Sequence, residues 1–184
     1  SIINNWNNII DESDIVYFLG DLSLGKNVED TYLYLSKILK GNIIILRGNH
    51  DRSNSTLSKY FTVIEQGYKL HYKDYNFILS HQPLFENQIP KDYINIHGHI
   101  HDKIIKSKYH INVSADVIGF SPISVDNIID SILQGLYYVK DIGIIMKEGI
   151  MRKLATIEKI SDIQPIENAD AIEVVTVKGW KVVV

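Results

Sequence analysis

The chain has 184 residues, of which 45% are hydrophobic, which suits one full hydrophobic core with a small appendage. It contains no cysteine, which excludes disulfides and thiolate metal sites. The formal net charge of −3 argues against a strongly basic nucleic-acid surface. Apolar runs stay shorter than a membrane span and nothing resembles a signal peptide, so we expect a cytoplasmic protein without a membrane partner.

The first half of the sequence alternates between helices and strands. Apolar residues at helical spacing predict a helix over residues 2–10, and a continuous apolar run predicts a buried strand at 15–19. A second helix is predicted at 27–39, ending before Gly41, and a second strand at 43–47. This alternation is typical of a parallel sheet, so the predicted fold class is α/β.

The second half is richer in strands. Residue patterns predict strands at 61–65, 68–72, 75–80, 93–97 and 109–113, a tight turn at 73–74 and a final helix at 124–133. We expect these strands to form an antiparallel flank beside the parallel centre. The predicted domain covers residues 1–135, and residues 136–150 are interpreted as a junction.

Four of the predicted strands end in short polar motifs. These are Gly20-Asp21, Gly48-Asn49-His50-Asp51, Ser80-His81 and Gly98-His99-Ile100-His101. Ligands bind beyond the carboxyl ends of strands in open α/β sheets, so one carboxylate, one amide and several imidazoles are expected at a single rim. Such a mixed set of ligands suits a divalent metal, and imidazole favours Mn, Fe, Ni or Zn over Ca.

Each motif taken alone has a more ordinary explanation. Asp21 could be a turn or helix-cap residue, and Asn49 could be a turn residue. His99 and His101 could belong to a solvated loop. His97 precedes the glycine, so it is expected to pack or to support its neighbours.

Taken in this order, the four motifs resemble the calcineurin-like metallophosphoesterase family. The resemblance runs from about residue 2 to about residue 132, including the run 112–116, and it implies the β-sandwich with flanking helices of that family. It implies two divalent metals, with Mn²⁺ expected first and Fe, Ni or Zn as alternatives. It also implies that a hydroxide bridging the metals hydrolyses a phosphate mono- or diester.

The resemblance also assigns roles to individual residues. Asp21 would bridge both metals, and the other ligands would be Asn49, His81 and His99 for one metal and His101 for the other. His50 would face the scissile phosphate, and Asp51 would orient His50.

The chain departs from this family at its start. The family carries an Asp-x-His motif on a strand upstream of Gly20-Asp21, whereas residues 1–14 contain no histidine. We therefore expect a chain that is truncated at its amino end, with a depleted second metal site and impaired activity. The strand at 15–19 is then expected to lack a parallel neighbour.

A second resemblance begins at Met151. Residues 151–184, including the stretch Pro165-Ile166-Glu167-Asn168-Ala169-Asp170, resemble the start of the N-terminal OB-fold domain of Deinococcus-type RNA ligases. This resemblance implies a short, partial OB-like β tail. It also suggests a nucleotide or nucleic acid as the phosphate-ester substrate and a link to nucleic-acid end repair.

Three classes of function remain open at this point. The first is a metal-dependent phosphoesterase, a hydrolase whose activity is impaired by truncation. The second is a catalytically weak fragment that binds metal or phosphate. The third is an RNA-binding module fused to the start of a ligase. The oligomeric state and the choice between monoester and diester also stay open.

Overall fold

The computed structural model describes residues 1–23, 25, 27–135 and 181–183. The helices are α1 (Ile2–Ile9), α2 (Val28–Ile38), α3 (Asn54–Leu57) and α4 (Val125–Leu133), with a 3-10 helix at Glu86–Gln88. The strands are β1 (Ile15–Phe18), β2 (Asn42–Leu46), β3 (Thr62–Ile64), β4 (Tyr68–Tyr72), β5 (Tyr75–Ser80), β6 (Tyr93–His97), β7 (His110–Asn112), β8 (Ile123–Ser124) and β9 (Lys181–Val183).

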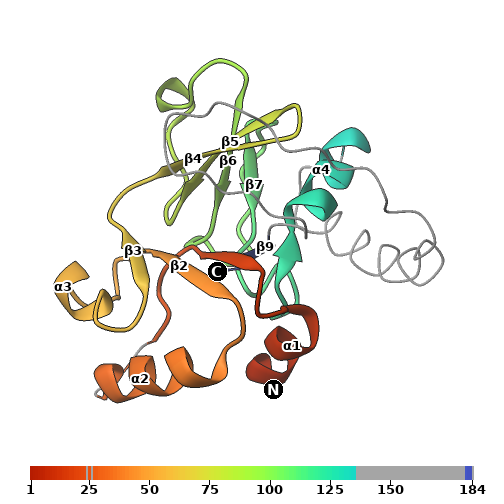
Figure 1. Cartoon of the computed structure of the whole chain (residues 1–184). Coiled ribbons are helices and arrows are strands. Elements are labelled where there is room, and N and C mark those ends of the chain that lie inside the picture. Colours follow the sequence, from red (N-terminus) through yellow and green to blue (C-terminus); the bar gives the residue numbers. More distant parts are fainter. Residues whose placement is uncertain (24, 26, 136–180, 184) are drawn as a thin grey trace.

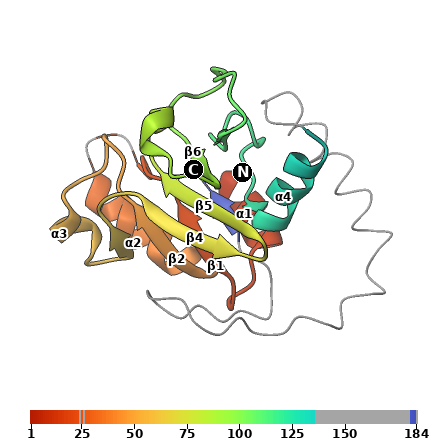
Figure 2. The same ribbon diagram turned by 90° about the horizontal axis from the view of Figure 1, so that it is seen from above.

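The strands form two sheets (Figure 1). The first sheet has the order β3-β2-β1-β9-β8, and the second has the order β4-β5-β6-β7. In the first sheet β3, β2, β1 and β9 are parallel, and β8 runs antiparallel to β9. Seen from above, β4 and β5 lie across β1 and β2 (Figure 2). The predicted α/β class, with mixed sheets and flanking helices, is confirmed.

The second sheet contains parallel strand pairs where the sequence predicts an antiparallel flank. The predicted turn joins β4 and β5 as an antiparallel hairpin, and Lys73 in it has a left-handed backbone (φ 52°). By contrast, β5 pairs parallel with β6, and β6 pairs parallel with β7. The connections 81–92 and 98–109 explain the difference, because about a dozen residues suffice for a crossover between parallel strands.

The neighbour of β1 also differs from the expectation. Val16 pairs with Lys181 and Phe18 pairs with Val183, so β9 lies parallel to β1 on the side opposite β2. The expectation that β1 would lack a parallel neighbour on that side is therefore wrong. The remaining residues of the segment 151–184, and the junction at 136–150, lie outside the described residues, so the predicted OB-like tail stays a prediction.

Strand β1 separates two hydrophobic cores. Val16 and Phe18 belong to the core beneath the first sheet, which also contains Trp6 of α1 and Tyr32 of α2. Tyr17 belongs to the larger core between the two sheets, which also contains Phe77 and Ile96 of the second sheet and Ile128 of α4. A parallel strand buried on both faces reads as a continuous apolar run, which is why this strand could be predicted.

The helices cover the outer face of the first sheet and one end of the sandwich. In Figure 1, α1 and α2 lie on the side of the first sheet that faces away from the second sheet. Helix α4 is capped by Ser124, whose hydroxyl accepts a hydrogen bond from the Asn127 N–H, as the sequence predicts. In the part of the chain that the structure describes, each helix is too short or too polar to cross a membrane.

Candidate metal centre

Two glycines bring the ends of β1 and β2 into direct contact. A Cβ atom on Gly20, which has a φ of +100°, would lie 2.5 Å from the backbone nitrogen of Gly48. A Cβ atom on Gly48 would lie 2.2 Å from Oδ1 of Asp21. Any larger side chain at either position would push the two loops apart. Both positions therefore require glycine if Asp21 is to reach the loop that follows β2.

Asp21 follows Gly20 at the carboxyl end of β1. Its backbone is left-handed, with a φ of 58°, which is uncommon for a non-glycine residue. Oδ1 accepts a hydrogen bond from the backbone N–H of His50 at 2.8 Å. Oδ2 lies 3.4 Å from Nε2 of His81. One oxygen thus holds the neighbouring loop, and the other faces the imidazoles.

His81 follows β5 and is the best-fixed member of the cluster, since its side chain is only 8% exposed. Its Nδ1 lies 2.6 Å from the carbonyl oxygen of Leu19. Because a carbonyl oxygen only accepts hydrogen bonds, Nδ1 carries the proton and Nε2 of the neutral ring carries a lone pair. That lone pair faces Oδ1 of Asn49 at 2.8 Å and Nδ1 of His99 at 3.1 Å.

This arrangement of atoms fits a metal ion. Asp21, His81 and His99 each offer one ligand atom, and the three atoms lie within 4.8 Å of one another. Nε2 of His81 and Oδ1 of Asn49 can both donate an electron pair, and at 2.8 Å from each other they are placed to share one cation. The combination of carboxylate, amide oxygen and imidazole nitrogen matches the preferences of divalent transition metals. Four of the predicted ligands are thus brought together at one rim.

The turn after β6 places His99 in the cluster. The Gly98 N–H donates to the carbonyl of His81 at 3.0 Å, and both His99 (φ 67°) and His101 (φ 53°) have left-handed backbones. Burial, followed by the nearby ring of His81, lowers the pKa of His99. A lowered pKa favours the neutral ring, which is the form that binds a metal.

His101 lies apart from this cluster. Its Nδ1 lies 2.8 Å from Oδ2 of Asp116, and its side chain is 76% exposed. In the described ranges the group of candidate metal-binding side chains contains Asp21, His81 and His99 but not His101. The structure therefore shows one gathered ligand set, and the assignment of His101 to a second metal stays a prediction.

The carboxylate of Asp51 joins the loops rather than the ring of His50. Oδ2 accepts from the backbone N–H groups of Asp21 (2.7 Å) and Gly48 (2.9 Å). Oδ1 accepts from the Leu22 N–H (3.0 Å) and from the hydroxyl of Tyr32 (3.1 Å). Within the described residues no hydrogen bond connects this carboxylate to the His50 ring, so the predicted orientation of His50 by Asp51 stays a prediction.

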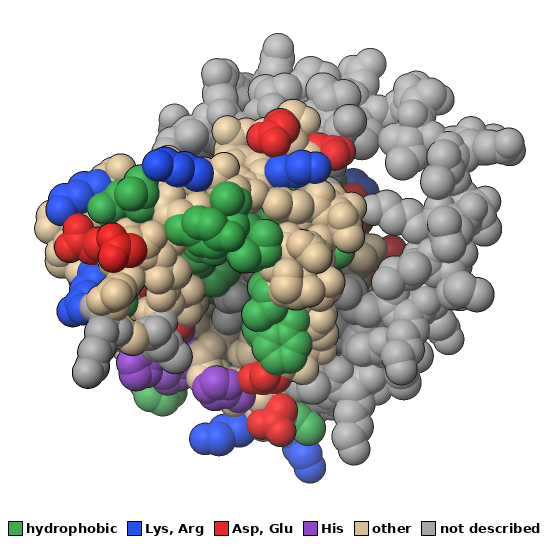
Figure 3. Space-filling model, turned by 90° about the horizontal axis from the view of Figure 1, so that it is seen from below, with side chains coloured by type: hydrophobic (Ala, Val, Ile, Leu, Met, Phe, Trp, Pro, Cys, Tyr) green, Lys and Arg blue, Asp and Glu red, His purple; other side chains and the backbone are tan. Residues whose placement is uncertain are grey.

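His50 lies in an exposed part of the same loop. Its backbone N–H is held by Asp21, while its side chain is open to solvent. The surface seen in Figure 3 shows His side chains close to acidic side chains at one edge of that face. An exposed side chain on this loop is accessible to a substrate, and the role of His50 toward the phosphate stays a prediction.

Two further residues, His97 and Tyr32, are buried next to the loops that carry the candidate ligands. His97 is fully buried, its Nδ1–H donates to the Gly98 carbonyl at 3.0 Å, and burial lowers its pKa to about 4. The expectation that His97 packs is confirmed. Sequence reasoning missed Tyr32, whose hydroxyl donates to Asp51 and accepts from the Arg52 N–H. Its only sequence signal is an inward position on the predicted helix, and burial raises its pKa to about 12.

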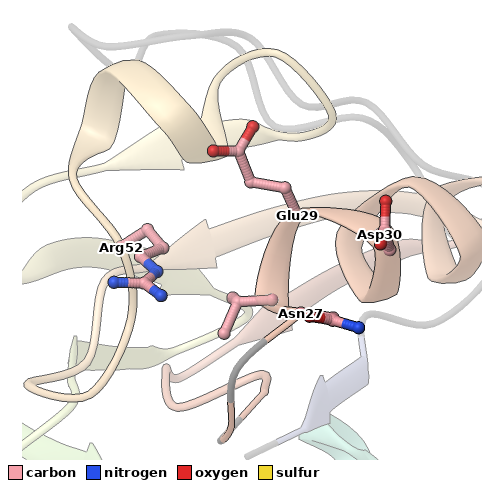
Figure 4. Close-up of a pocket in the computed structure, with 5 residues that line it drawn as sticks. Asn27, Glu29, Asp30 and Arg52 are labelled. Atoms are coloured by element: carbon pink, nitrogen blue, oxygen red, sulfur yellow. The ribbon is translucent and has the colours of Figure 1, made fainter.

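A pocket of about 290 Å³ lies beside the loop of Asp51. It is lined by Asn27, Glu29 and Asp30 at the start of α2 and by Arg52. Figure 4 shows Arg52 on the loop across from the first turn of α2. The pocket therefore combines two carboxylates with one guanidinium, and the residue that carries the guanidinium, Arg52, directly follows Asp51 in sequence.

An α/β fold with carboxylate and imidazole ligands gathered at its strand ends is typical of metal-dependent hydrolases. A family model described as calcineurin-like phosphoesterase matches residues 1–172. The chain therefore belongs to the calcineurin-like phosphoesterase family, whose members bind divalent metals and hydrolyse phosphate esters.

Two individual proteins are similar to this chain. The uncharacterized protein MJ1445 of Methanocaldococcus jannaschii is 39% identical over 142 residues, which cover 73% of this chain and 75% of that protein. The crystal structure of AQ665 from Aquifex aeolicus, a protein of unknown function, superposes with a TM-score of 0.56 at 26% identity. That match covers 70% of this chain and 82% of the other.

The family match also bears on the predicted tail. It extends through the junction at 136–150 and into the segment 151–184, as far as residue 172. The comparisons give no support to the interpretation of that segment as the start of an RNA ligase.

Proposed function

We propose that the chain is a hydrolase that cleaves a phosphate mono- or diester with the help of two divalent metal ions, Mn²⁺ being the first candidate. The observation that carries the proposal is the convergence of electron-pair donors from Asp21, Asn49, His81 and His99 at one rim. These donors come from four separate strand ends. Such a meeting of ligands is difficult to explain by packing alone.

The proposal assigns the candidate ligands to two metal ions. Asp21, Asn49, His81 and His99 would hold one metal, and Asp21 would share its carboxylate with the metal that His101 serves. Divalent ions bound here would lower the pKa of a water molecule and stabilise negative charge on the phosphoryl oxygens. The hydrogen bond from Nδ1–H of His81 to the carbonyl of Leu19 fixes the orientation of the ring and leaves Nε2 as the nitrogen that faces the metal position.

His50 would act on the substrate rather than on the metal. Its backbone is fixed by Asp21, and its ring is exposed beside the ligand set. From this position an imidazole can donate a proton to the leaving oxygen or stabilise the charge that develops on it. We therefore assign His50 to the phosphate side of the site.

A second candidate is a protein that binds one metal with little catalysis. It is favoured by the position of His101, which pairs with Asp116 outside the gathered ligand set. Binding of a single equivalent of Mn²⁺ without ester hydrolysis would support this second candidate. A role in nucleic-acid end repair depends on the segment 151–184, and we do not include it in the proposal.

The test uses the full chain after chelator treatment. We expect hydrolysis of p-nitrophenyl phosphate or bis-p-nitrophenyl phosphate on addition of Mn²⁺. His81→Ala should weaken binding of the first metal at least about tenfold and abolish hydrolysis. His71→Ala is the matched control, because His71 is an exposed residue on β4 outside the cluster. Equal calorimetric affinity in the wild type and His81→Ala would exclude this ligand set.

A further inference from the structure

The ring of Tyr32 is fixed inside the core beneath the first sheet. Tyr32 is one of the buried residues of α2 and is 0% exposed. Its ring centroid lies 6.4 Å from that of Phe61, edge-on, and 6.2 Å from that of Tyr60. A phenylalanine ring would make the same contacts, so packing alone does not require the hydroxyl group. A buried hydroxyl group is unfavourable unless it is hydrogen-bonded, so its partners show what it is for.

The hydrogen bonds that the structure describes for this hydroxyl go to the loop after β2. The hydroxyl donates to Oδ1 of Asp51 at 3.1 Å and accepts from the backbone N–H of Arg52 at 3.3 Å. The two partners lie 19 and 20 residues from Tyr32 in sequence. The loop is therefore attached to a helix whose position is set by the hydrophobic core.

The Asp51 carboxylate connects this attachment to a candidate metal ligand. Its Oδ2 accepts from the backbone N–H groups of Asp21 and Gly48, at 2.7 and 2.9 Å. In return, Oδ1 of Asp21 accepts from the backbone N–H of His50 at 2.8 Å. The loops after β1 and β2 thus hold each other through reciprocal hydrogen bonds between carboxylates and backbone N–H groups. The direction of the Asp21 side chain depends on this pair of contacts.

The conformation of Asp21 requires such contacts. Its φ of 58° lies in the left-handed region, and Gly20 before it has a φ of +100°. A left-handed backbone at a residue other than glycine costs free energy and persists only where the surrounding structure enforces it. Asp21 is therefore held by a series of hydrogen bonds that begins at a buried side chain on α2, outside both loops.

We infer that Tyr32 is a positioning residue of the candidate metal centre: through Asp51, its hydroxyl keeps the Asp21 carboxylate directed at the imidazoles of the ligand set. This inference deepens the proposed function, because it rests on the gathered ligands of the first metal, and it does not require a second metal. Burial raises the pKa of Tyr32 to about 12, so the hydroxyl keeps its proton and can donate near neutral pH.

The first test needs no metal. Amide hydrogen exchange is compared in the chelated full chains of the wild type and Tyr32→Phe, a change that removes the hydroxyl and keeps the ring. The N–H groups of Asp21 and Gly48 should exchange about 3–10-fold faster in Tyr32→Phe, which corresponds to the loss of one hydrogen bond. The N–H groups within β1 and β2 should keep their rates. Equal acceleration of all these groups would reflect a general loss of stability and would overturn the inference.

Trp6→Phe is the control for this exchange experiment. Trp6 lies on α1 in the same core, and its Nε1–H donates to the Lys40 carbonyl at 2.9 Å rather than to the loop after β2. Trp6→Phe therefore removes one hydrogen bond from the core without detaching Asp51. A selective acceleration at Asp21 and Gly48 in Trp6→Phe as well would remove the special role of Tyr32.

The second test is calorimetry with Mn²⁺ alone. Tyr32→Phe should weaken the first equivalent about 3–10-fold, again the equivalent of one hydrogen bond. Tyr34→Phe should keep the wild-type affinity, because Tyr34 lies on the same helix and is 57% exposed. Since Tyr32 acts through Asp51, Tyr32→Phe should cause no further loss in an Asp51→Asn background. Additive losses in the double variant, or an unchanged affinity in Tyr32→Phe, would overturn the inference.

The outcomes for the two proposals are distinguishable. If Tyr32→Phe binds Mn²⁺ and hydrolyses ester as well as the wild type does, the inference fails while the proposed function stands. If Tyr32→Phe loses affinity as expected but the wild type hydrolyses neither ester, the proposed function loses support and the positioning role stands. If the wild type binds no Mn²⁺, both fail.

Discussion

The carboxylate of Asp51 accepts a hydrogen bond from the backbone N–H of Asp21 at 2.7 Å, across the two loops that follow β1 and β2. The same oxygen accepts from the Gly48 N–H within its own loop. The Asp51 carboxylate therefore links the two loops just beyond the carboxyl ends of the parallel strands β1 and β2. The position of Asp21, and with it the ligand cluster, depends on this carboxylate.

Replacing Asp51 should destabilise the fold. Asp51→Ala leaves the N–H groups of Asp21, Leu22 and Gly48 without their acceptor, and we expect a loss of about 2–3 kcal/mol in the free energy of unfolding, since hydrogen bonds to a charged group contribute about 1.5–3 kcal/mol. Chemical denaturation measures this loss. Asp130→Ala on the exposed face of α4 is the control, and equal unfolding midpoints for the two variants would contradict the bridging role.

Adding one methyl group at Gly48 should weaken metal binding. The Cβ atom of Gly48→Ala would meet Oδ1 of Asp21 at 2.2 Å and its backbone nitrogen at 2.4 Å, so Asp21 must move. We expect at least tenfold weaker Mn²⁺ binding by calorimetry. Gly119→Ala is a useful comparison, because a Cβ atom there meets nothing within 4 Å. It should keep the wild-type affinity even if its own backbone is strained.

His50→Ala should affect turnover and not metal binding. The exposed ring of His50 lies outside the gathered ligand set, so its loss should lower kcat by about 10²–10⁴, the range for a general acid or base. Steady-state kinetics and calorimetry on the same preparation separate the two effects. A parallel loss of Mn²⁺ affinity would instead make His50 a metal ligand.

Acidification should destabilise the metal-free protein through His97. Burial lowers the pKa of His97 from 6.5 to about 4, so between these values the unfolded state binds more protons than the folded state. Stability from this group is complete above pH 6.5 and falls by about 3 kcal/mol as the pH decreases toward 4. Urea denaturation across this window measures the slope, and His97→Leu should flatten it. Equal slopes in both proteins would refute the assignment.

The secondary structure was largely predictable because it depends on local periodicity. The strand predicted at 68–72 and the strand at 75–80 match β4 and β5 to the residue, since alternating side chains and a two-residue turn are encoded locally. Partners between strands are not encoded in this way. The parallel pairing of β5 with β6 and the pairing of β1 with β9 therefore became clear only from the structure.

The candidate site was predictable to the extent that strand ends determine it. Asp21, Asn49, His81 and His99 follow apolar runs, and the sheets bring those ends together. The role of Tyr32 depends on two hydrogen bonds between its hydroxyl and the loop after β2, which leave no periodic or compositional pattern. The described contacts of Asp51 show the same limit, because its four partners are three backbone groups and one hydroxyl.

The pairing of Val16 with Lys181 has a consequence for how the protein forms in the cell. The ribosome synthesises β1 and β2 early, whereas β9 becomes available only after nearly all of the intervening chain has emerged. Contacts between residues so far apart in sequence raise the contact order and slow folding, because a long loop must close first. Until that happens the nascent chain presents an unpaired edge of β1 that can recruit a foreign strand. Pairing with β9 therefore removes this edge of β1 from contact with other chains.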